Sequence, residues 1–408
     1  MIKPELLAPA GDRERLNAAL QYGADAVYLA GPAFGMRTAP ANFSQEELRR
    51  AVSDAHRQGV RVYVTSNILP RNEELKQLPV YLEEWQDMGV DALIVADLGV
   101  MALAQRYASR CALHVSTQFG VVNSETASRL YDLGAVRAVL ARELSIEEIA
   151  EIRQKAPKEL ELEAFVHGAM CMSYSGRCML SAYLNGRDGN RGDCTQPCRW
   201  SYQLVEPHRP DRPFTVEEDD RGTYLFNAHD LNMIEHLPAL YQAGVTSFKI
   251  EGRAKAAYYV AVTTNAYRAV IDGWEASGFR KDYRPEDWMV EELNRVSHRP
   301  YGTGFYYGQP CQDTRSGGYI RDWEVVAVAT GWRDGIQQLE QRNRFFAGEE
   351  LSVLSPGQKP YMIVASPLLD EEGQPIEAAP HPTMKLQIPL AEPLVPGALL
   401  RHRCKESV

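Results

Sequence analysis

The sequence predicts a (β/α)8 TIM-like barrel with a cysteine-rich insertion after its seventh strand, followed by a small C-terminal all-β domain. Three observations support this fold class. Short β-rich runs alternate with helical patterns through the first half of the chain, an eighth run follows a long interruption, and helical character is nearly absent after residue 318. A doubly wound open sheet is the alternative arrangement of the same alternating units.

Seven β-rich runs define the regular part of the predicted barrel. They cover residues 5–10, 25–31, 60–67, 91–97, 112–118, 136–143 and 160–168. Residues 44–59 and 145–156, which lie between such runs, show apolar residues at three-to-four-residue spacing and begin with a serine. This pattern is typical of capped amphipathic helices, so the segments between the strands are predicted to be helices.

The eighth predicted strand, residues 245–252, comes only after an insertion at about 169–244. The barrel domain is therefore expected to span residues 1–310. Active sites of such barrels form at the carboxyl ends of the strands, which places the insertion over the barrel mouth. Within it, residues 207–222 contain little that a core could bury, and an exposed excursion is expected there.

The last part of the chain, residues 318–408, contains short strand-like runs separated by Gly, Pro and Asp. These runs read EVVAVATGW, EELSVLS, YMIVAS, MKLQIPL and ALLRHR. A small closed β-barrel or a sandwich-like β domain is the expected result.

Composition and charge restrict the class of protein. Of the 408 residues, 45% are hydrophobic and 24% charged, which is typical of a globular protein. Neither a signal peptide nor a membrane-spanning run is recognisable, so a cytoplasmic location without membrane association is expected. The formal net charge of −10 argues against a protein that coats nucleic acid through a broad basic surface, and leaves room for a local basic patch.

Four of the seven cysteines lie close together in the insertion, at Cys171, Cys178, Cys194 and Cys198. Cysteines in a reducing compartment are not expected to form disulfides, so this grouping indicates a metal centre. Four thiolates suit either a 4Fe-4S cluster or a tetrahedral zinc ion. Zinc sites usually use tight pairs, whereas six residues separate Cys171 from Cys178, and this spacing favours iron–sulfur over zinc.

The stretch EAFVHGAMCMSYSGRCMLS at residues 163–181 resembles the signature of the collagenase-like peptidase family, peptidase family U32. The segments PELLAPAG, YGADAVYL, HVSTQ and FKIEGR extend the resemblance over about the first 310 residues. It implies a protein that carries a 4Fe-4S cluster. Despite the family name, several of its branches hydroxylate tRNA, ribosomal RNA or ubiquinone precursors without dioxygen.

The segments NRGDCTQPCRW (190–200), LFNAHDL (225–231) and SFKIEGRAKAAYYVA (247–261) are similar to the tRNA branch. That similarity implies tRNA as the partner, 5-hydroxyuridine at the wobble position as the product, and prephenate as the source of the hydroxyl group. Members of the family also act as pairs of paralogues, which leaves a paralogous partner subunit as an alternative. One departure is Ala228-His229-Asp230-Leu231, where the family commonly has Ser-Lys-Asp-Leu, and this puts a substrate role for the segment in doubt.

Polar residues at predicted strand ends are the candidates for substrate binding. They are Asn67, Asp97, Gln118, Arg142, Glu143, Lys249, Glu251 and Arg253. Prephenate carries two carboxylates, and Arg142, Lys249 and Arg253 are the cations able to bind them. The alternative for any one of these charges is an ion pair around the barrel mouth.

Glu163 and His167, near the end of the seventh predicted strand, are the candidate catalytic residues, because a carboxylate and an imidazole can transfer protons. A structural role is preferred for His114. For RNA, the expected contacts come from side chains near the cysteines that offer phosphate charge and one stacking face. They are Arg177, Arg187, Arg191, Arg199 and Trp200, and solvated surface arginines are the alternative.

Two other classes of function remain open. A peptidase needs a nucleophile with a base or a catalytic metal, yet neither HExxH nor GxSxG occurs. Cys171 as the nucleophile of a peptidase would leave the other three cysteines unexplained. A zinc-stabilised RNA-binding scaffold is the non-enzymatic alternative, and metal content would distinguish it.

Overall fold

The computed structural model describes residues 2–35, 42–171, 173–174, 176–200, 203–204, 214–215, 228–310 and 319–404. The side chain of Arg199 and most of the predicted excursion at 207–222 lie outside the described residues.

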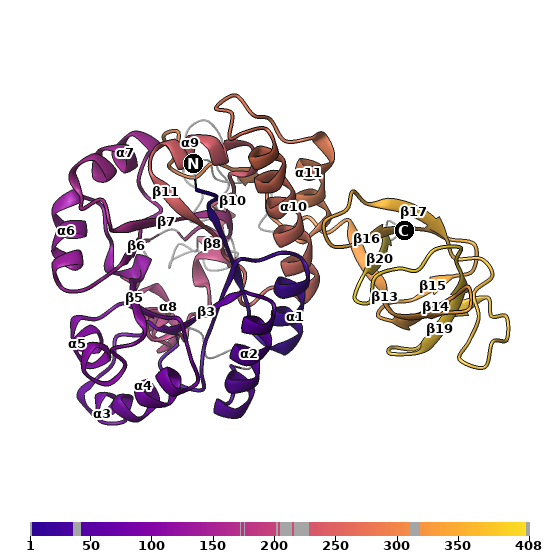
Figure 1. Cartoon of the computed structure of the whole chain (residues 1–408), viewed down its shortest axis with the longest axis horizontal. Coiled ribbons are helices and arrows are strands. Elements are labelled where there is room, and N and C mark those ends of the chain that lie inside the picture. Colours follow the sequence, from indigo (N-terminus) through magenta and orange to yellow (C-terminus); the bar gives the residue numbers. More distant parts are fainter. Residues whose placement is uncertain are drawn as a thin grey trace.

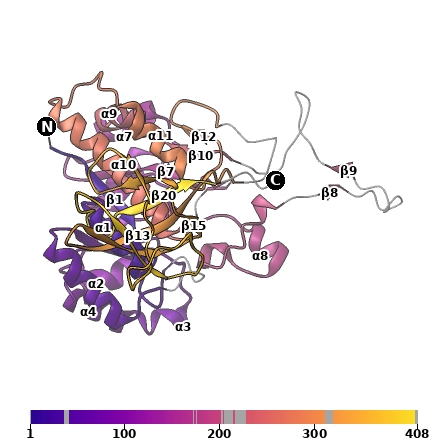
Figure 2. The same cartoon turned by 90° about the vertical axis from the view of Figure 1, so that its right-hand side faces the viewer.

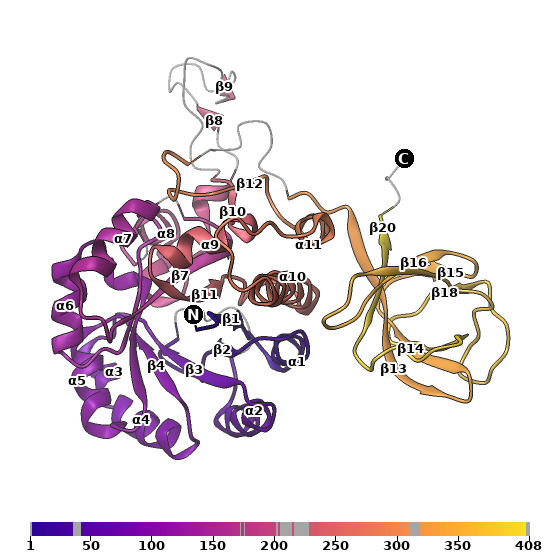
Figure 3. The ribbon, with the colours of Figure 1, turned by 45° about the horizontal axis from the view of Figure 1, so that its top comes forward.

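Eight parallel strands close into a barrel, which confirms the predicted fold class (Figure 3). They are β1 (Glu5–Pro9), β2 (Ala26–Leu29), β3 (Arg61–Ser66), β4 (Ala92–Val95), β5 (Ala112–Val115), β6 (Arg137–Val139), β7 (Glu161–Gly168) and β11 (Val245–Ile250). Each of β1 to β6 pairs with the next strand, and β11 completes the ring by pairing with both β7 and β1. The alternative of an open doubly wound sheet is therefore wrong.

Helices surround this ring (Figure 1). They are α1 (Arg13–Gln21), α2 (Gln45–Arg57), α3 (Asn72–Leu75), α4 (Leu78–Asp87), α5 (Leu98–Tyr107), α6 (Ser124–Asp132), α7 (Ile146–Lys155), α9 (Leu237–Gln242), α10 (Ala257–Ala276) and α11 (Asp287–Glu292). Ser44 and Ser145 each form a capping box with a glutamate three residues later, at the start of α2 and α7. These two predicted helices begin at their serines because the side chains satisfy backbone N–H groups that the helix leaves unpaired.

The insertion after β7 contains α8 (Leu180–Asn185), the 3-10 helices η2 (Gly189–Arg191) and η3 (Pro197–Arg199), and the short strands β8 (Gln203–Leu204) and β9 (Phe214–Thr215). Figure 2 shows α8, β8 and β9 on the same side of the molecule. The chain then returns through β10 (Asp230–Asn232), which pairs antiparallel with the end of β7 and parallel with β12 (Tyr301–Gly302).

The C-terminal domain is an antiparallel six-stranded sheet in the order β17-β16-β20-β13-β14-β19. Its strands are β13 (Trp323–Arg333), β14 (Ile336–Gln341), β16 (Glu350–Leu354), β17 (Tyr361–Val364), β19 (Lys385–Pro389) and β20 (Leu399–Arg403), with a separate pair β15 (Phe345–Phe346) and β18 (Ala378–Ala379). The predicted runs correspond to all of the large sheet except β14. Its sequence IQQLEQ is too polar to stand out, although Gln337 and Gln341 are buried.

Each of the two parts of the chain has a hydrophobic core, and Leu354 of β16 packs into the core of the barrel. The C-terminal domain lies beside α10 and α11 (Figures 1 and 3). Arg401 of β20 donates two 2.7 Å hydrogen bonds to the Glu292 carboxylate of α11. The hydroxyl of Tyr22, the residue directly after α1, donates to the carbonyl of Leu354 at 3.0 Å. Among the described residues, none of the helices is both long and apolar enough to cross a membrane.

Candidate active site at the barrel mouth

A buried ionic network occupies the barrel interior near the amino-terminal ends of the strands. The Arg137 guanidinium of β6 lies 2.5 Å from the Glu5 carboxylate of β1 and 3.1 Å from the Glu163 carboxylate of β7. The Tyr63 hydroxyl donates to Glu5 at 2.6 Å. Burial alone would raise the pKa of Glu5, but the nearby arginine lowers it below the usual range, so the carboxylate stays ionised.

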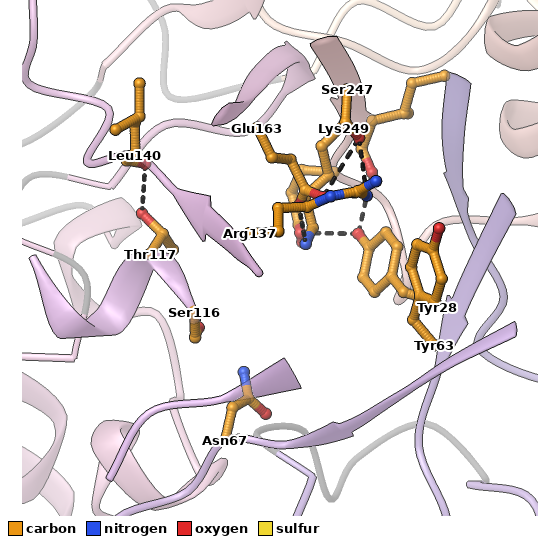
Figure 4. Close-up of polar contacts among 12 residues, drawn as sticks. Tyr28, Tyr63, Asn67, Ser116, Thr117, Arg137, Leu140, Glu163, Ser247 and Lys249 are labelled. Carbon is orange, nitrogen blue, oxygen red and sulfur yellow. Dashed lines mark hydrogen bonds and ion pairs between the residues drawn. The ribbon is translucent and has the colours of Figure 1, made fainter. Parts of the chain in front are cut away.

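Lys249, near the carboxyl end of β11, contacts this network through Glu163 (Figure 4). Its ammonium donates to Glu163 at 2.7 Å and lies over the rings of Tyr28 and Phe165, at 4.7 and 5.5 Å from their centroids. Glu163 is fully buried and Lys249 is 5% exposed. The structure therefore brings a candidate catalytic residue and a candidate substrate-binding residue together as a desolvated ion pair.

Arg142, at the end of β6, lies where the cysteine-bearing insertion begins. Its guanidinium donates to the carbonyl of Ala169 at 2.9 Å and lies 5.2 Å from the Phe165 ring centroid. Burial alone would lower the pKa of Arg142, but its hydrogen-bonded contact with the Cys171 thiolate and the nearby Glu251 carboxylate raise it. A persistent cation next to a thiol favours the thiolate, which is the metal-binding form of cysteine.

A second group of polar residues lies at the carboxyl ends of β3 and β5. Arg253 donates to the Thr65 hydroxyl at 3.2 Å and to the Asn42 amide oxygen at 2.9 Å. The Asn67 amide nitrogen donates to the Gln118 side-chain oxygen at 2.6 Å. Asn67 follows β3 and Ser116 follows β5, two strands that only β4 separates in the ring, and Figure 4 shows both side chains. These predicted substrate residues thus converge on the mouth.

The remaining predicted substrate residues have other surroundings. Asp97 caps α5, because its carboxylate accepts from the Val100 backbone N–H at 3.0 Å. Burial raises the pKa of Glu143, and its Oε2 is buried with no hydrogen-bond partner among the described residues. Glu251 accepts a 3.2 Å hydrogen bond from the Tyr28 hydroxyl. A substrate role for Asp97 stays a prediction beside its capping role.

His167 points away from the barrel interior. Its ring packs among Tyr259 and Tyr267 of α10 and Tyr301 of β12, with centroids 5.4 to 5.8 Å away. The register against β11 shifts between the pairs Lys249–Phe165 and Ile250–His167, so the alternation of sides changes along β7. Burial lowers the pKa of His167 to about 3, and the ring is neutral near pH 7. The structure therefore separates His167 from Glu163.

His114 has a buried environment, as expected of a structural histidine. It is 4% exposed and packs edge-on against the Tyr63 ring at 4.6 Å. Burial and the nearby cations Arg137 and Lys249 lower the pKa of His114 well below its usual value.

The four clustered cysteines fit a metal centre by chemistry. Cys171 and Cys194 are exposed and Cys178 and Cys198 are half-buried, whereas Cys111 is buried in the barrel core. The Cys194 sulfur accepts a 3.3 Å hydrogen bond from the Gln196 backbone N–H. Within the described ranges, no three Cys, His, Asp or Glu side chains gather closely enough to hold a single metal ion. The ligand set therefore stays a prediction that rests on its thiols.

The insertion packs directly on the mouth. A Cβ atom added at Gly176 would lie 2.9 Å from the Gln118 Cβ and 3.2 Å from its carbonyl oxygen, so only glycine fits without a shift. Gly176 also has a φ of +77°, which favours glycine. The segment that carries the cysteines therefore covers Gln118.

Two of the predicted RNA-binding arginines are engaged in ion pairs. Arg191 donates to both carboxylate oxygens of Glu74 in α3, at 2.6 and 3.0 Å, and Arg187 pairs with Asp193. Arg177 lies beside Gly120, and Trp200 is 45% exposed. RNA contact by these residues stays a prediction.

Sequence reasoning missed the partners that fix these groups. They are Glu5, Tyr28, Tyr63, Thr65, Ser116, Arg137 and Ser247. The available signal was the presence of charged residues inside otherwise apolar strand runs, namely Glu5 in ELLAPA and Arg137 in VRAVL.

Comparison with known proteins gives matches over both domains. Residues 11–316 match the model described as peptidase family U32, and residues 321–401 match the model of the peptidase family U32 C-terminal domain.

Three relatives show the range of names among similar proteins. The chain is 36% identical over 409 residues to tRNA hydroxylation protein P1 of Bacillus subtilis, covering 98% of this chain and 94% of that protein. It is 37% identical to tRNA hydroxylation protein P of Escherichia coli, covering 87% of each chain. It is 39% identical over 304 residues to the 23S rRNA 5-hydroxycytidine C2501 synthase of Escherichia coli, covering 72% of this chain and 44% of that protein.

Proposed function

Because this chain belongs to peptidase family U32, we propose that it is an oxygen-independent tRNA hydroxylase that converts the wobble uridine to 5-hydroxyuridine. The observation that carries the proposal is the similarity to tRNA hydroxylation protein P1, which extends over nearly the whole of both chains. The extent of the similarity supports the proposal because it includes the C-terminal domain as well as the barrel.

The proposed cofactor is a 4Fe-4S cluster held by Cys171, Cys178, Cys194 and Cys198, with zinc as the alternative metal. Two features support it: the four thiols belong to one segment over the barrel mouth, and Arg142 hydrogen-bonds Cys171 and favours its thiolate. When bound, such a cluster supplies electron-transfer chemistry. The chain's own side chains would bind and orient the substrates beside it.

The proposed hydroxyl donor is prephenate, bound through its carboxylates at the mouth. Arg142 and Arg253 follow β6 and β11, two strands that only β7 separates in the ring. Deeper in the barrel, Lys249 is neutralised by Glu163, so that pair adds little net charge. Arg142 and Arg253 are therefore the cations at the mouth that would hold an acid with two carboxylates.

The proposed macromolecular substrate is tRNA, whose wobble base would enter the same mouth. Trp200 offers an exposed ring for stacking, and Arg177 and Arg199 offer phosphate contacts near the cysteines. A paralogous partner subunit stays part of the proposal as an alternative assembly.

Nucleoside analysis tests this function. tRNA from a strain that lacks the protein and its paralogues should contain no 5-hydroxyuridine or its derivatives, and the wild-type chain should restore them. Cys171→Ala should fail to restore them, whereas Cys111→Ala, which changes a cysteine of the barrel core, should succeed. Unchanged 5-hydroxyuridine in the deletion strain would remove the tRNA assignment.

Ribosomal RNA is the second candidate substrate, because one similar protein is named as a 23S rRNA 5-hydroxycytidine synthase. Analysing 23S rRNA from the same strains separates the tRNA and rRNA candidates.

A peptidase is less well supported, since His114 and His167, two buried histidines of the barrel strands, pack against tyrosine rings. A ubiquinone precursor stays an alternative that quinone analysis of the same strains addresses.

A further inference from the structure

Gln118 carries an amide whose orientation is fixed by its neighbours. Its side-chain oxygen accepts from the Asn67 amide nitrogen at 2.6 Å and lies 3.3 Å from the Ser116 hydroxyl, which donates to it. An amide oxygen has two acceptor positions, and these two donors fill both. If the Gln118 amide were flipped, its N–H groups would point at the N–H group of Asn67, and the hydrogen bond between the two side chains would be lost.

The amide nitrogen of Gln118 is left with two N–H groups and has no hydrogen-bond partner in the part of the chain that the structure describes, although the atom is buried. The residue as a whole is 8% exposed. A buried donor without an acceptor destabilises a folded protein, so such an atom calls for an explanation. A bound ligand that offers an oxygen is one explanation.

The position of Gln118 supports that explanation. It belongs to η1 (Thr117–Phe119), directly after β5 at the carboxyl end of the barrel, and it lies under Gly176 of the cysteine-bearing insertion. Arg253 donates to Thr65, two residues before Asn67 on the same strand end. A cation and an oriented amide donor therefore flank the end of β3.

We propose that Gln118 is a substrate-binding residue that donates its side-chain N–H groups to an oxygen of the bound substrate, and that Asn67 is the positioning residue that fixes the amide. The inference rests on the proposed function for the identity of the substrates. The shared chemistry is a carboxylate or carbonyl oxygen, supplied either by the acid or by the nucleobase. The neighbouring Arg253 favours the carboxylate.

Gln118→Glu is the sharpest test, because it keeps the shape and the oxygen that Asn67 and Ser116 bind while it replaces both N–H groups by an acceptor. Gln154→Glu, at an exposed position of α7, is the control with the same change in charge. Binding is measured on the full-length protein by calorimetry, with prephenate and separately with unmodified tRNA. We expect Gln118→Glu to weaken prephenate binding about tenfold to hundredfold.

Asn67→Asp tests the positioning role. An aspartate at this position accepts from the Gln118 nitrogen, which turns the amide oxygen toward the substrate. We therefore expect the loss of prephenate binding to resemble that of Gln118→Glu, although Gln118 itself is intact.

The outcomes separate this inference from the proposed function. Weakened prephenate binding assigns the oxygen to the acid, and weakened tRNA binding assigns it to the nucleobase; either supports the role of Gln118. Wild-type affinity of Gln118→Glu for both ligands overturns that role and leaves the tRNA hydroxylase intact. Gln118-dependent prephenate binding in a protein that leaves tRNA unmodified keeps the inference and removes the proposed function. A wild-type protein that binds neither ligand overturns both.

Discussion

Lys249 and Glu163 form a 2.7 Å ion pair inside the barrel, between the paired strands β11 and β7, which the insertion separates in the sequence. Arg137 lies on the other side of the same carboxylate at 3.1 Å. The pair therefore belongs to a buried network in which each charge has a partner. This network lies inside the barrel, deeper than the residues at the mouth.

Removing the Glu163 charge should destabilise the protein strongly. In Glu163→Gln, Lys249 and Arg137 stay buried while one of the two buried carboxylates is lost, which costs about 3–5 kcal/mol in comparable cases. Glu161→Gln is the control, because its carboxylate also pairs with Arg137 but is 48% exposed. Urea unfolding measures both. Equal effects of the two substitutions would contradict the burial argument.

The Arg401–Glu292 pair should fix the C-terminal domain to the barrel. Arg401 is fully buried and Glu292 nearly so, and replacing Glu292 by methionine leaves Arg401 without its carboxylate, at a cost of about 3–5 kcal/mol. Arg401→Met should cost less, because Arg295 still pairs with Glu292 at 3.1 Å. The double replacement by methionine should recover much of this stability. A double-mutant cycle followed by urea unfolding measures the coupling. Additive losses would show that the two residues act independently.

Stability should fall at acid pH partly because of His167. Its pKa is about 3 in the folded protein and about 6.5 in an unfolded chain. Between these pH values the unfolded state binds a proton that the folded state does not. The contribution of the neutral, buried His167 to stability is therefore complete above about pH 6.5 and is lost as the pH falls toward about 3.

His167→Asn should reduce that pH dependence. The limiting slope of one titrating group is about 1.4 kcal/mol per pH unit, and unfolding free energies at about pH 7 and about pH 5 measure it. The buried His114 should account for part of the remaining slope, because burial lowers its pKa too. His56→Asn, at a more exposed position, is the control, and a similar reduction there would refute the assignment.

The four clustered cysteines should bind iron. Protein purified without oxygen should contain about four irons and four acid-labile sulfides per chain, with a broad visible absorption. Alanine at Cys171, Cys178, Cys194 or Cys198 should lower both contents, whereas alanine at Cys111 should not. One zinc per chain without sulfide would favour the zinc alternative.

Substitutions in the Arg191–Glu74 ion pair should distinguish a structural role of Arg191 from a role in RNA contact. If Arg191 mainly ties the insertion to α3, Glu74→Gln should impair tRNA modification as much as Arg191→Met, and exchanging the two residues should restore part of it. If Arg191 contacts phosphate, Glu74→Gln should be harmless or raise tRNA affinity, because the arginine is released. Filter binding to tRNA measures the difference.

Local pattern was enough to predict the barrel. Strand runs such as 60–67 and capped helices such as the one that begins after Ser145 are encoded within a few residues, since period and capping are local properties. The grouping of the four cysteines is likewise visible in the sequence. β14 was missed because three of its six residues are glutamine, and only packing in the sheet makes two of these glutamines buried.

What the sequence by itself determined was the order of strands and helices, the place of the insertion and the set of polar residues at the strand ends. Only the tertiary structure decided which of them meet. Closure of the ring brings Glu5, Arg137 and Glu163 together across more than a hundred residues of chain, and no local pattern encodes such contacts. A register shift in β7 turns His167 outward, and the Asn67 hydrogen bond orients the amide of Gln118, because side-chain direction depends on partners that the fold supplies.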